Sequence, residues 1–174
     1  MMVPELSRPF AASSLPKTGQ TLRLEASQEE CTALAARMRI PQIYDFICTF
    51  RLEPGSGGVV MAEGELLARV QQICVVTLEP FDTEVRERFR VEFVPAGSEK
   101  NDPDPFSIDE IPYEQGVIDL GEAAAEQLAL ALDPYPHAPF AVLPDAADAA
   151  DDDEENSRPV ASPFGVLARW QRSH

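Results

Sequence analysis

The segment from residue 101 to residue 157 contains neither lysine nor arginine, although it carries 16 aspartates and glutamates. Those acids equal the formal net charge of the whole 174-residue chain, which is -16 at pH 7. The rest is nearly balanced, with 11 basic and 14 acidic residues in 1–100 and three basic residues against none in 158–174. Charge separated in this way predicts a surface that attracts basic proteins and repels phosphate backbones. A basic patch more than roughly 8 Å away would still act locally, because salt screens the repulsion over that distance.

Long hydrophobic runs are also missing. No run approaches the roughly 20 residues that span a bilayer, and residues 1–17 lack the basic and apolar regions of a signal peptide. We therefore expect a cytoplasmic protein with no membrane partner. A chain of 174 residues that is 44% hydrophobic predicts one folded domain with an acidic appendage.

Cysteine is scarce. Cys31, Cys48 and Cys74 are odd in number, far apart and without a C-x-x-C spacing. This pattern argues against both a disulfide framework and a zinc site. We expect three reduced core residues, no metal and no cofactor.

Hydrophobic periodicity predicts an α+β fold, with an antiparallel sheet and two main helices. Alternating residues predict strands at 21–25, 44–53, 59–79 and 83–94, and the glycine-rich residues 54–58 a hairpin turn rather than a phosphate-binding loop. On the third of these strands, Cys74, Val76 and Leu78 are expected to face the core. Residues 1–20 and 95–112 are expected to be extended or loop.

Two helices have clear start signals. Ser27 and Glu30 form a predicted capping box before a helix that Pro41 ends. Asp119 is expected to cap the second helix, with Glu122 completing its box. Leu120, Ala124, Leu128, Ala131 and Leu132 follow as its buried stripe.

Three arginines, Arg86, Arg88 and Arg90, are expected to share the outer face of the strand at 83–94. Cross-strand pairing with acidic neighbours is the simplest explanation. Contact with RNA, or with the chain's own acidic segment, is the alternative.

Signals for catalysis are sparse. The sequence has no H-E-x-x-H, G-x-S-x-G, P-loop or dinucleotide-binding fingerprint and only two histidines, so we expect no catalytic residue and no small-molecule substrate. A cysteine-dependent hydrolase would need Cys74, His137 and an aspartate together. Glu122 and Glu126 would suit a general acid and base only if burial split their pKa values, and a solvated helix face explains them more simply.

The end of the chain changes character twice. Seven acids among small residues in 145–155 predict a solvated linker, and we divide the chain into a domain at 1–143, a linker at 144–162 and a docking segment at 163–174. Phe164, Leu167 and Trp170 recur at helical spacing and predict a short helix that docks on the chain's own sheet or on a partner.

Two segments carry a resemblance to a known family. The sequence ARVQQICVVTLEPF (68–81), followed by GVIDLGEAAAEQLALALDPYPHAP (116–139), resembles the YceD family, the large ribosomal RNA subunit accumulation proteins, in its alphaproteobacterial form. Ser7-Arg8-Pro9, residues 34–37 and SPFGVLARW (162–170) are similar to other parts of the family, so the resemblance covers nearly the whole chain. Many members carry C-x-R-C-L-E, of which only Cys74, Leu78 and Glu79 are present here, with Val76 and Thr77 at the other positions.

The resemblance implies a cytosolic, non-enzymatic ribosome biogenesis factor that supports accumulation or processing of large-subunit (23S) ribosomal RNA. The residues that match the family signature are Cys74, Leu78, Glu79, Asp119, Leu120, Gly121, Glu122, Pro134, Tyr135 and Pro136. Because the chain is so acidic, we expect the partner to be a basic large-subunit ribosomal protein or a precursor large subunit. The residues expected to bind it are Asp151, Asp152, Asp153, Glu154, Glu155, Phe164, Leu167 and Trp170. Direct binding of precursor ribosomal RNA through Arg86, Arg88 and Arg90 is the alternative.

Overall fold

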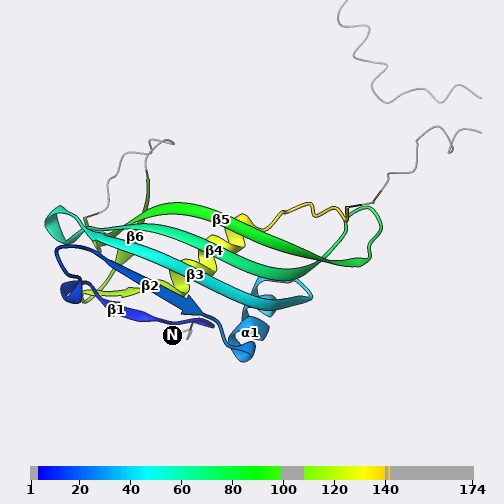
Figure 1. Ribbon diagram of the computed structural model, residues 1–174, viewed down its shortest axis with the longest axis horizontal. Helices are drawn as coiled ribbons and strands as arrows, with labels where there is room; N and C mark the ends of the chain where they lie inside the picture. The colour runs from blue at the N-terminus through cyan, green and yellow to red at the C-terminus, as the bar shows by residue number, and fades with distance from the viewer. Residues whose placement is uncertain (1–3, 99–107, 140, 142–174) are drawn as a thin grey trace, which may run out of the picture. The chain divides into compact units, whose positions relative to one another are not determined.

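The computed structural model describes residues 4–98, 108–139 and 141. Its centre is a five-stranded sheet in the order β2-β3-β4-β5-β6 (Figure 1). The strands are β2 (Gln20–Glu25), β3 (Gln42–Pro54), β4 (Val60–Ile73), β5 (Pro80–Pro95) and β6 (Asp109–Tyr113). The first four pair antiparallel, and β6 pairs parallel to β5. The α+β class predicted from the sequence is confirmed.

Two helices and a small second sheet complete the described fold. Helix α1 (Gln28–Met38) joins β2 to β3, and α2 (Leu120–Ala131) lies behind the sheet (Figure 1). Strands β1 (Pro9–Ala11) and β7 (Val117–Asp119) form a separate antiparallel pair. Short 3-10 turns, η1 (Ala12–Ser14) and η2 (Ser56–Gly58), follow β1 and join β3 to β4. The predicted hairpin turn at 54–58 is therefore confirmed.

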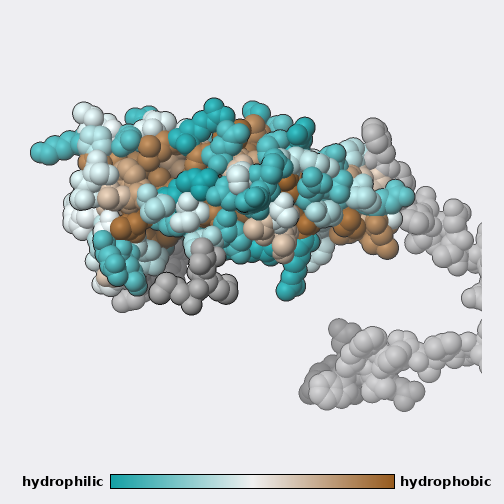
Figure 2. Space-filling view, turned by 90° about the horizontal axis from the view of Figure 1, so that it is seen from below, coloured by the Kyte–Doolittle hydropathy of each residue, from teal (hydrophilic) through white to brown (hydrophobic). Residues whose placement is uncertain are grey.

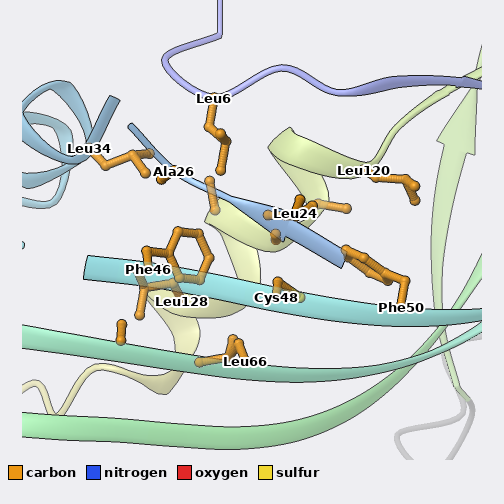
Figure 3. Packing of buried hydrophobic residues seen from close by; sticks show 14 of the residues in the cluster. Leu6, Leu24, Ala26, Leu34, Phe46, Cys48, Phe50, Leu66, Leu120 and Leu128 are labelled. Carbon is orange, nitrogen blue, oxygen red and sulfur yellow. The ribbon is translucent and has the colours of Figure 1, made fainter. Parts of the chain in front are cut away.

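The core lies on the face of the sheet that α2 covers. Phe46, Cys48 and Phe50 of β3 belong to the same buried cluster as Leu128 of α2 and Leu6 of the N-terminal segment (Figure 3), and all five are fully buried. Gly64 on β4 gives the ring of Phe89 room, because a Cβ there would lie 2.1 Å from that ring. Phe89 thereby reaches Phe50 edge-on, with 5.6 Å between ring centroids.

The opposite face of the sheet, which we call the outer face, carries the alternate, polar residues of β2 to β5. A register shift between Ile43 and Asp45 places Tyr44 on this face beside Asp45. The shift explains how Ile43 and Phe46 can both be buried.

Three expectations about strands were wrong. Strand β4 ends at Ile73 rather than Glu79, because the chain must reverse to pair Ile73 with Pro80. Leu78, with φ 58° and 76% of its surface exposed, lies in that reversal instead of facing the core. Part of the expected loop at 95–112 belongs to β6 (Asp109–Tyr113), which pairs parallel to β5, so the sheet is not wholly antiparallel.

Candidate functional site

Each arginine on the outer face of the sheet is paired with a carboxylate. Arg88 and Arg90 of β5 bind the cross-strand residues Glu65 and Glu63 of β4, at 3.3 and 2.9 Å. The other pairs on this face are Arg86–Glu84, Arg69–Asp45, Arg51–Glu53 and Arg23–Glu25. The cross-strand pairing expected from the sequence is therefore present for Arg88 and Arg90, whereas Arg86 pairs within its own strand.

These ion pairs are open to solvent, with 81% of the Arg88 side chain and 71% of the Arg90 side chain exposed. Exposed pairs of this kind contribute roughly 0 to 1 kcal/mol each to stability. They nevertheless neutralise the positive charge locally. A phosphate would have to compete with Glu63 and Glu65 for the same guanidinium groups. The outer face also holds Tyr44, whose ring lies under the Arg69 guanidinium at 5.3 Å.

A second group of contacts consists of hydrogen bonds that join residues 7 and 8 to both helices. The guanidinium of Arg8 binds both carboxylate oxygens of Glu30 on α1, at 2.7 and 2.9 Å. The backbone N–H of Arg8 and the hydroxyl of Ser7 donate to the two oxygens of Asp119, the cap of α2. Partial burial opposes ionisation of Asp119, but these donors hold its pKa below the usual value.

Arg37 makes a third link, this time between the helices themselves. Its guanidinium binds both oxygens of Glu122 on α2, at 3.0 and 2.7 Å, and also Glu5. The expectation that Glu122 completes the capping box of α2 was therefore wrong, because its carboxylate is held by Arg37 instead. Asp119 alone caps the helix, accepting from the N–H groups of Gly121 and Glu122. Glu122 thus joins α2 to α1 through Arg37.

Cys74 lies at the end of β4 beneath the segment 133–138, which we call the strap. The N–H of Val75 donates to Pro136 O and the side chain of Gln72, the one buried polar residue in the described part of the chain, donates to Asp133 O. The sulfur of Cys74 accepts from the N–H of Ala138 at 3.3 Å and from the N–H of Thr77 at 3.5 Å. These donors favour the thiolate, and they lower the Cys74 pKa to about 6.

All three cysteines are free and buried, as the sequence predicted. Their chemistry differs, however. Burial among apolar side chains raises the pKa of Cys48 to about 12, and burial also raises that of Cys31. The backbone donors around Cys74 were not foreseeable from the sequence, because they come from the turn and from the strap. His137 is exposed, and within the described residues no hydrogen bond joins its imidazole to Cys74.

A shallow pocket of about 520 Å³ lies beside the strap, between the end of α1 and the end of α2. Several hydrophobic residues near it are exposed, among them Ile73, Val75, Leu78 and Tyr135. Figure 2 shows hydrophobic residues exposed toward both ends of the face seen there, between stretches of hydrophilic residues. The family-signature residues lie in two places. The first is the start of α2, which contacts residues 5–8 and which we call the clasp; it contains Asp119, Leu120, Gly121 and Glu122. The second is the strap and the turn beside it, with Cys74, Leu78, Glu79, Pro134, Tyr135 and Pro136.

A second groove, of about 400 Å³, lies between α2 and the β6–β7 connection. Hydrophobic residues including Phe93, Ile111 and Ile118 form its floor. Five carboxylates line it, from Glu110, Glu114, Asp119, Glu122 and Glu126. The described part of the chain contributes no lysine, arginine or histidine to its lining.

Other predicted features fall outside what the structure describes. Asp151, Asp152, Asp153, Glu154, Glu155, Phe164, Leu167 and Trp170 lie outside the described residues, as do the linker and the docking segment. Within the described residues, no group of three or more histidine, cysteine or acidic side chains is arranged to hold a metal ion. No helix there is long and apolar enough to cross a membrane.

Comparison with known proteins assigns the chain to a family. A family model described as "Large ribosomal RNA subunit accumulation protein YceD" matches residues 62–169, more than half of the chain, and the chain therefore belongs to the YceD family. The family's name points to a role in the accumulation of large-subunit ribosomal RNA. The match begins within β4, so the resemblance of residues 7–9 and 34–37 stays a prediction. Neither a curated protein nor a solved structure matches the chain.

Sequence reasoning did not find the roles of Arg8 and Arg37. Both make two-oxygen contacts with residues far away in the chain, Arg8 with Glu30 and Arg37 with Glu122. No local pattern encodes such a contact. The only available signal was that both arginines lie in stretches that resemble the family.

Proposed function

We propose that this protein is a non-enzymatic, cytoplasmic factor that supports accumulation of large-subunit ribosomal RNA by binding a basic large-subunit ribosomal protein or a precursor particle. Family membership supports the role in accumulation of large-subunit ribosomal RNA. The arrangement of charge supports a basic binding partner.

The observation that carries the proposal is the pairing of every arginine on the outer face with a carboxylate. Because these arginines are already neutralised, the folded domain offers phosphates no unopposed positive surface there. The acids of residues 101–157 have no lysine or arginine among them. A lysine-rich protein is the partner that such a charge distribution attracts, and covering its basic surface would prevent indiscriminate RNA binding.

Asp151, Asp152, Asp153, Glu154 and Glu155 are proposed to provide long-range attraction. Phe164, Leu167 and Trp170 are proposed to provide an apolar contact, either with the partner or with the protein's own domain. The signature residues at the clasp and the strap are proposed to act by holding the domain together.

Direct RNA binding remains the second proposal, because Arg86, Arg88 and Arg90 project from one strand face with Tyr44 on the same sheet. Exposed ion pairs are weak enough to be exchanged for phosphate contacts.

The deciding experiment compares two variants of the full chain in binding to purified large-subunit ribosomal proteins across a salt titration. One variant replaces the seven acids of residues 145–155 by their amides, and the other carries Arg86→Gln, Arg88→Gln and Arg90→Gln. We expect the first variant to bind ribosomal proteins more weakly and with less salt dependence, and the second to bind like the unmodified protein. Tight binding of precursor RNA at physiological salt without any ribosomal protein would overturn the proposal.

A further inference from the structure

The groove between α2 and the β6–β7 connection combines an apolar floor with an acidic rim. Ile111 and Val117 line it, with Val117 44% exposed, and the buried Ile118 lies beneath them. Hydrophobic surface left accessible beside carboxylates suits a ligand that carries both an apolar and a cationic part.

Most of the carboxylates that line this groove are already engaged within the domain. Asp119 caps α2, Glu122 binds Arg37, and Glu110 has an interaction of its own. Glu114 and Glu126 are different, because both residues are exposed and, among the described residues, no hydrogen bond or ion pair engages either side-chain carboxylate. These two carboxylates are therefore available at the rim.

The electrostatic environment of Glu126 also favours a cationic ligand. Its pKa is raised, first by desolvation and then by the negative charge of Glu122, while Arg37 compensates only in part. A cation placed beside Glu126 would relieve this shortage of positive charge. An anion such as phosphate would increase it.

We propose that this groove binds a short segment of the basic partner in which a lysine or arginine stands next to a hydrophobic residue. The aliphatic stem and the hydrophobic neighbour lie on the floor, and the cationic group reaches Glu114 and Glu126 at the rim. The inference rests on the proposed function and assigns the folded domain a contact separate from the acidic residues 145–155. Those residues attract the partner at a distance, whereas the groove recognises a particular segment.

The test uses the full chain and a labelled 12-residue peptide in which Lys-Val-Lys-Ala is repeated three times. Fluorescence anisotropy is measured for the unmodified protein, for Glu114→Gln/Glu126→Gln and for the control Glu29→Gln/Glu87→Gln. The control removes the same formal charge from two exposed acids that do not line the groove. We expect affinity to fall about fivefold or more for the groove variant and to change less than about twofold for the control. Thermal unfolding confirms that both variants fold.

A carbodiimide cross-link provides a direct second readout, because it joins a lysine amine to a carboxylate in contact with it. We expect the peptide's lysines to be joined to Glu114 or Glu126 in the unmodified protein. Equal weakening by the groove and control variants would overturn the inference, since bulk charge alone would then explain binding. Cross-links from these glutamates only to Lys17 or Lys100 of a second copy would also overturn it, in favour of self-association.

Failure of this inference can be told apart from failure of the proposed function. If the groove variant binds the peptide normally while amidation of residues 145–155 abolishes binding of ribosomal proteins, the groove assignment is wrong and the proposed function stands. If the unmodified protein binds neither the peptide nor ribosomal proteins, both are wrong.

Discussion

The carbonyl oxygen of Leu6 lies where a side chain on Gly121 would have to go. A Cβ at position 121 would be 2.7 Å from that oxygen and 2.8 Å from the backbone nitrogen of Arg8. The N-terminal segment therefore passes directly against the first turn of α2, close enough for Arg8 and Ser7 to reach the Asp119 carboxylate. Both signature residues therefore serve the same contact: Gly121 leaves room for the N-terminal segment and Asp119 binds it.

Replacing Gly121 by alanine is expected to destabilise the protein by about 1 to 3 kcal/mol, because backbone atoms must shift to admit the methyl group. The usual effect in a helix is the opposite, since alanine is favoured over glycine by about 1 kcal/mol. Urea unfolding followed by circular dichroism measures the change. Ala129→Gly, at an exposed position on α2, serves as the control and should show only the propensity cost. A Gly121→Ala protein as stable as the unmodified one would contradict the close approach.

Local signals in the sequence predicted local structure well. Ser27 and Glu30 do form a complete capping box, and Asp119 does cap α2, because each interaction spans at most three residues. The alternation along β3 likewise placed Phe46, Cys48 and Phe50 in the core. Long-range features were not accessible in the same way. The parallel pairing of β6 with β5 and the contact of Glu122 with Arg37 both depend on residues distant in the chain.

The contact between Arg8 and Glu30 predicts a defined dependence of stability on pH. Hydrogen bonds from Arg8, helped by the capping N–H of Ser27, lower the pKa of Glu30 to about 2 from an ordinary value of 4.5. A carboxyl group with a depressed folded-state pKa stabilises the protein above its unfolded pKa and loses that contribution as pH falls through the folded pKa. The stabilisation should thus be complete above about pH 4.5 and disappear toward pH 2.

Glu30→Gln is expected to be less stable than the unmodified protein by about 1 to 2 kcal/mol at pH 7, an amount reduced by the partial exposure of Arg8. The difference should shrink between pH 4.5 and 2. Unfolding by urea at a series of pH values measures it. Glu29→Gln, on the same helix turn but outside this contact, is the control. A difference that stays constant down to pH 2 would show that the Glu30 carboxylate is not held by Arg8.

Because the strap covers Cys74 and donates a hydrogen bond to its sulfur, we expect a thiol with a low pKa that solvent cannot reach. Its pKa of about 6 is set first by the N–H of Ala138, and the side chain has no exposed surface. Ala138→Pro removes that donor, so the thiol pKa should rise and the strap should loosen. The thiolate absorbance near 240 nm, followed during a pH titration, should show its midpoint near 6 in the unmodified protein and higher in the variant.

Alkylation provides the complementary measurement. Cys74 should react slowly in the folded protein despite being a thiolate at neutral pH, because the strap limits access, and faster in Ala138→Pro. Cys48, with a pKa of about 12, is the internal control and should stay unreactive in both proteins. The lowered pKa also predicts that stability rises between about pH 6 and pH 9 and that Cys74→Ser removes this rise. An unchanged midpoint in Ala138→Pro would contradict the role of the Ala138 donor.

The chain's single tryptophan reports on the proposed docking segment. If Phe164, Leu167 and Trp170 bind the protein's own domain, Trp170 fluorescence should be shifted to the blue of free tryptophan in the isolated protein. Leu167→Ser should move the emission back toward the red, while Ser173→Ala should leave it unchanged. An emission maximum typical of full solvent exposure, shifting only when a partner is added, would instead assign the segment to the partner.

The ion pairs of the β5 arginines predict how substitutions on the outer face would affect RNA binding. Arg86, Arg88 and Arg90 are each held by a carboxylate, so removing them should cost little stability, less than about 1 kcal/mol for each exposed pair. If RNA binds directly through them, Arg86→Gln/Arg88→Gln/Arg90→Gln should flatten the slope of log affinity against log salt by two to three units, since about 0.7 to 0.9 counterions are released for each phosphate contact. We expect instead that the slope for RNA barely changes.

Glu63→Gln/Glu65→Gln is the matched comparison, because it frees Arg90 and Arg88 from their carboxylates. It should strengthen RNA binding only if the outer face is an RNA site. A marked gain with this variant, together with a loss in the arginine variant, would establish RNA as the direct partner and overturn the preference for a basic protein.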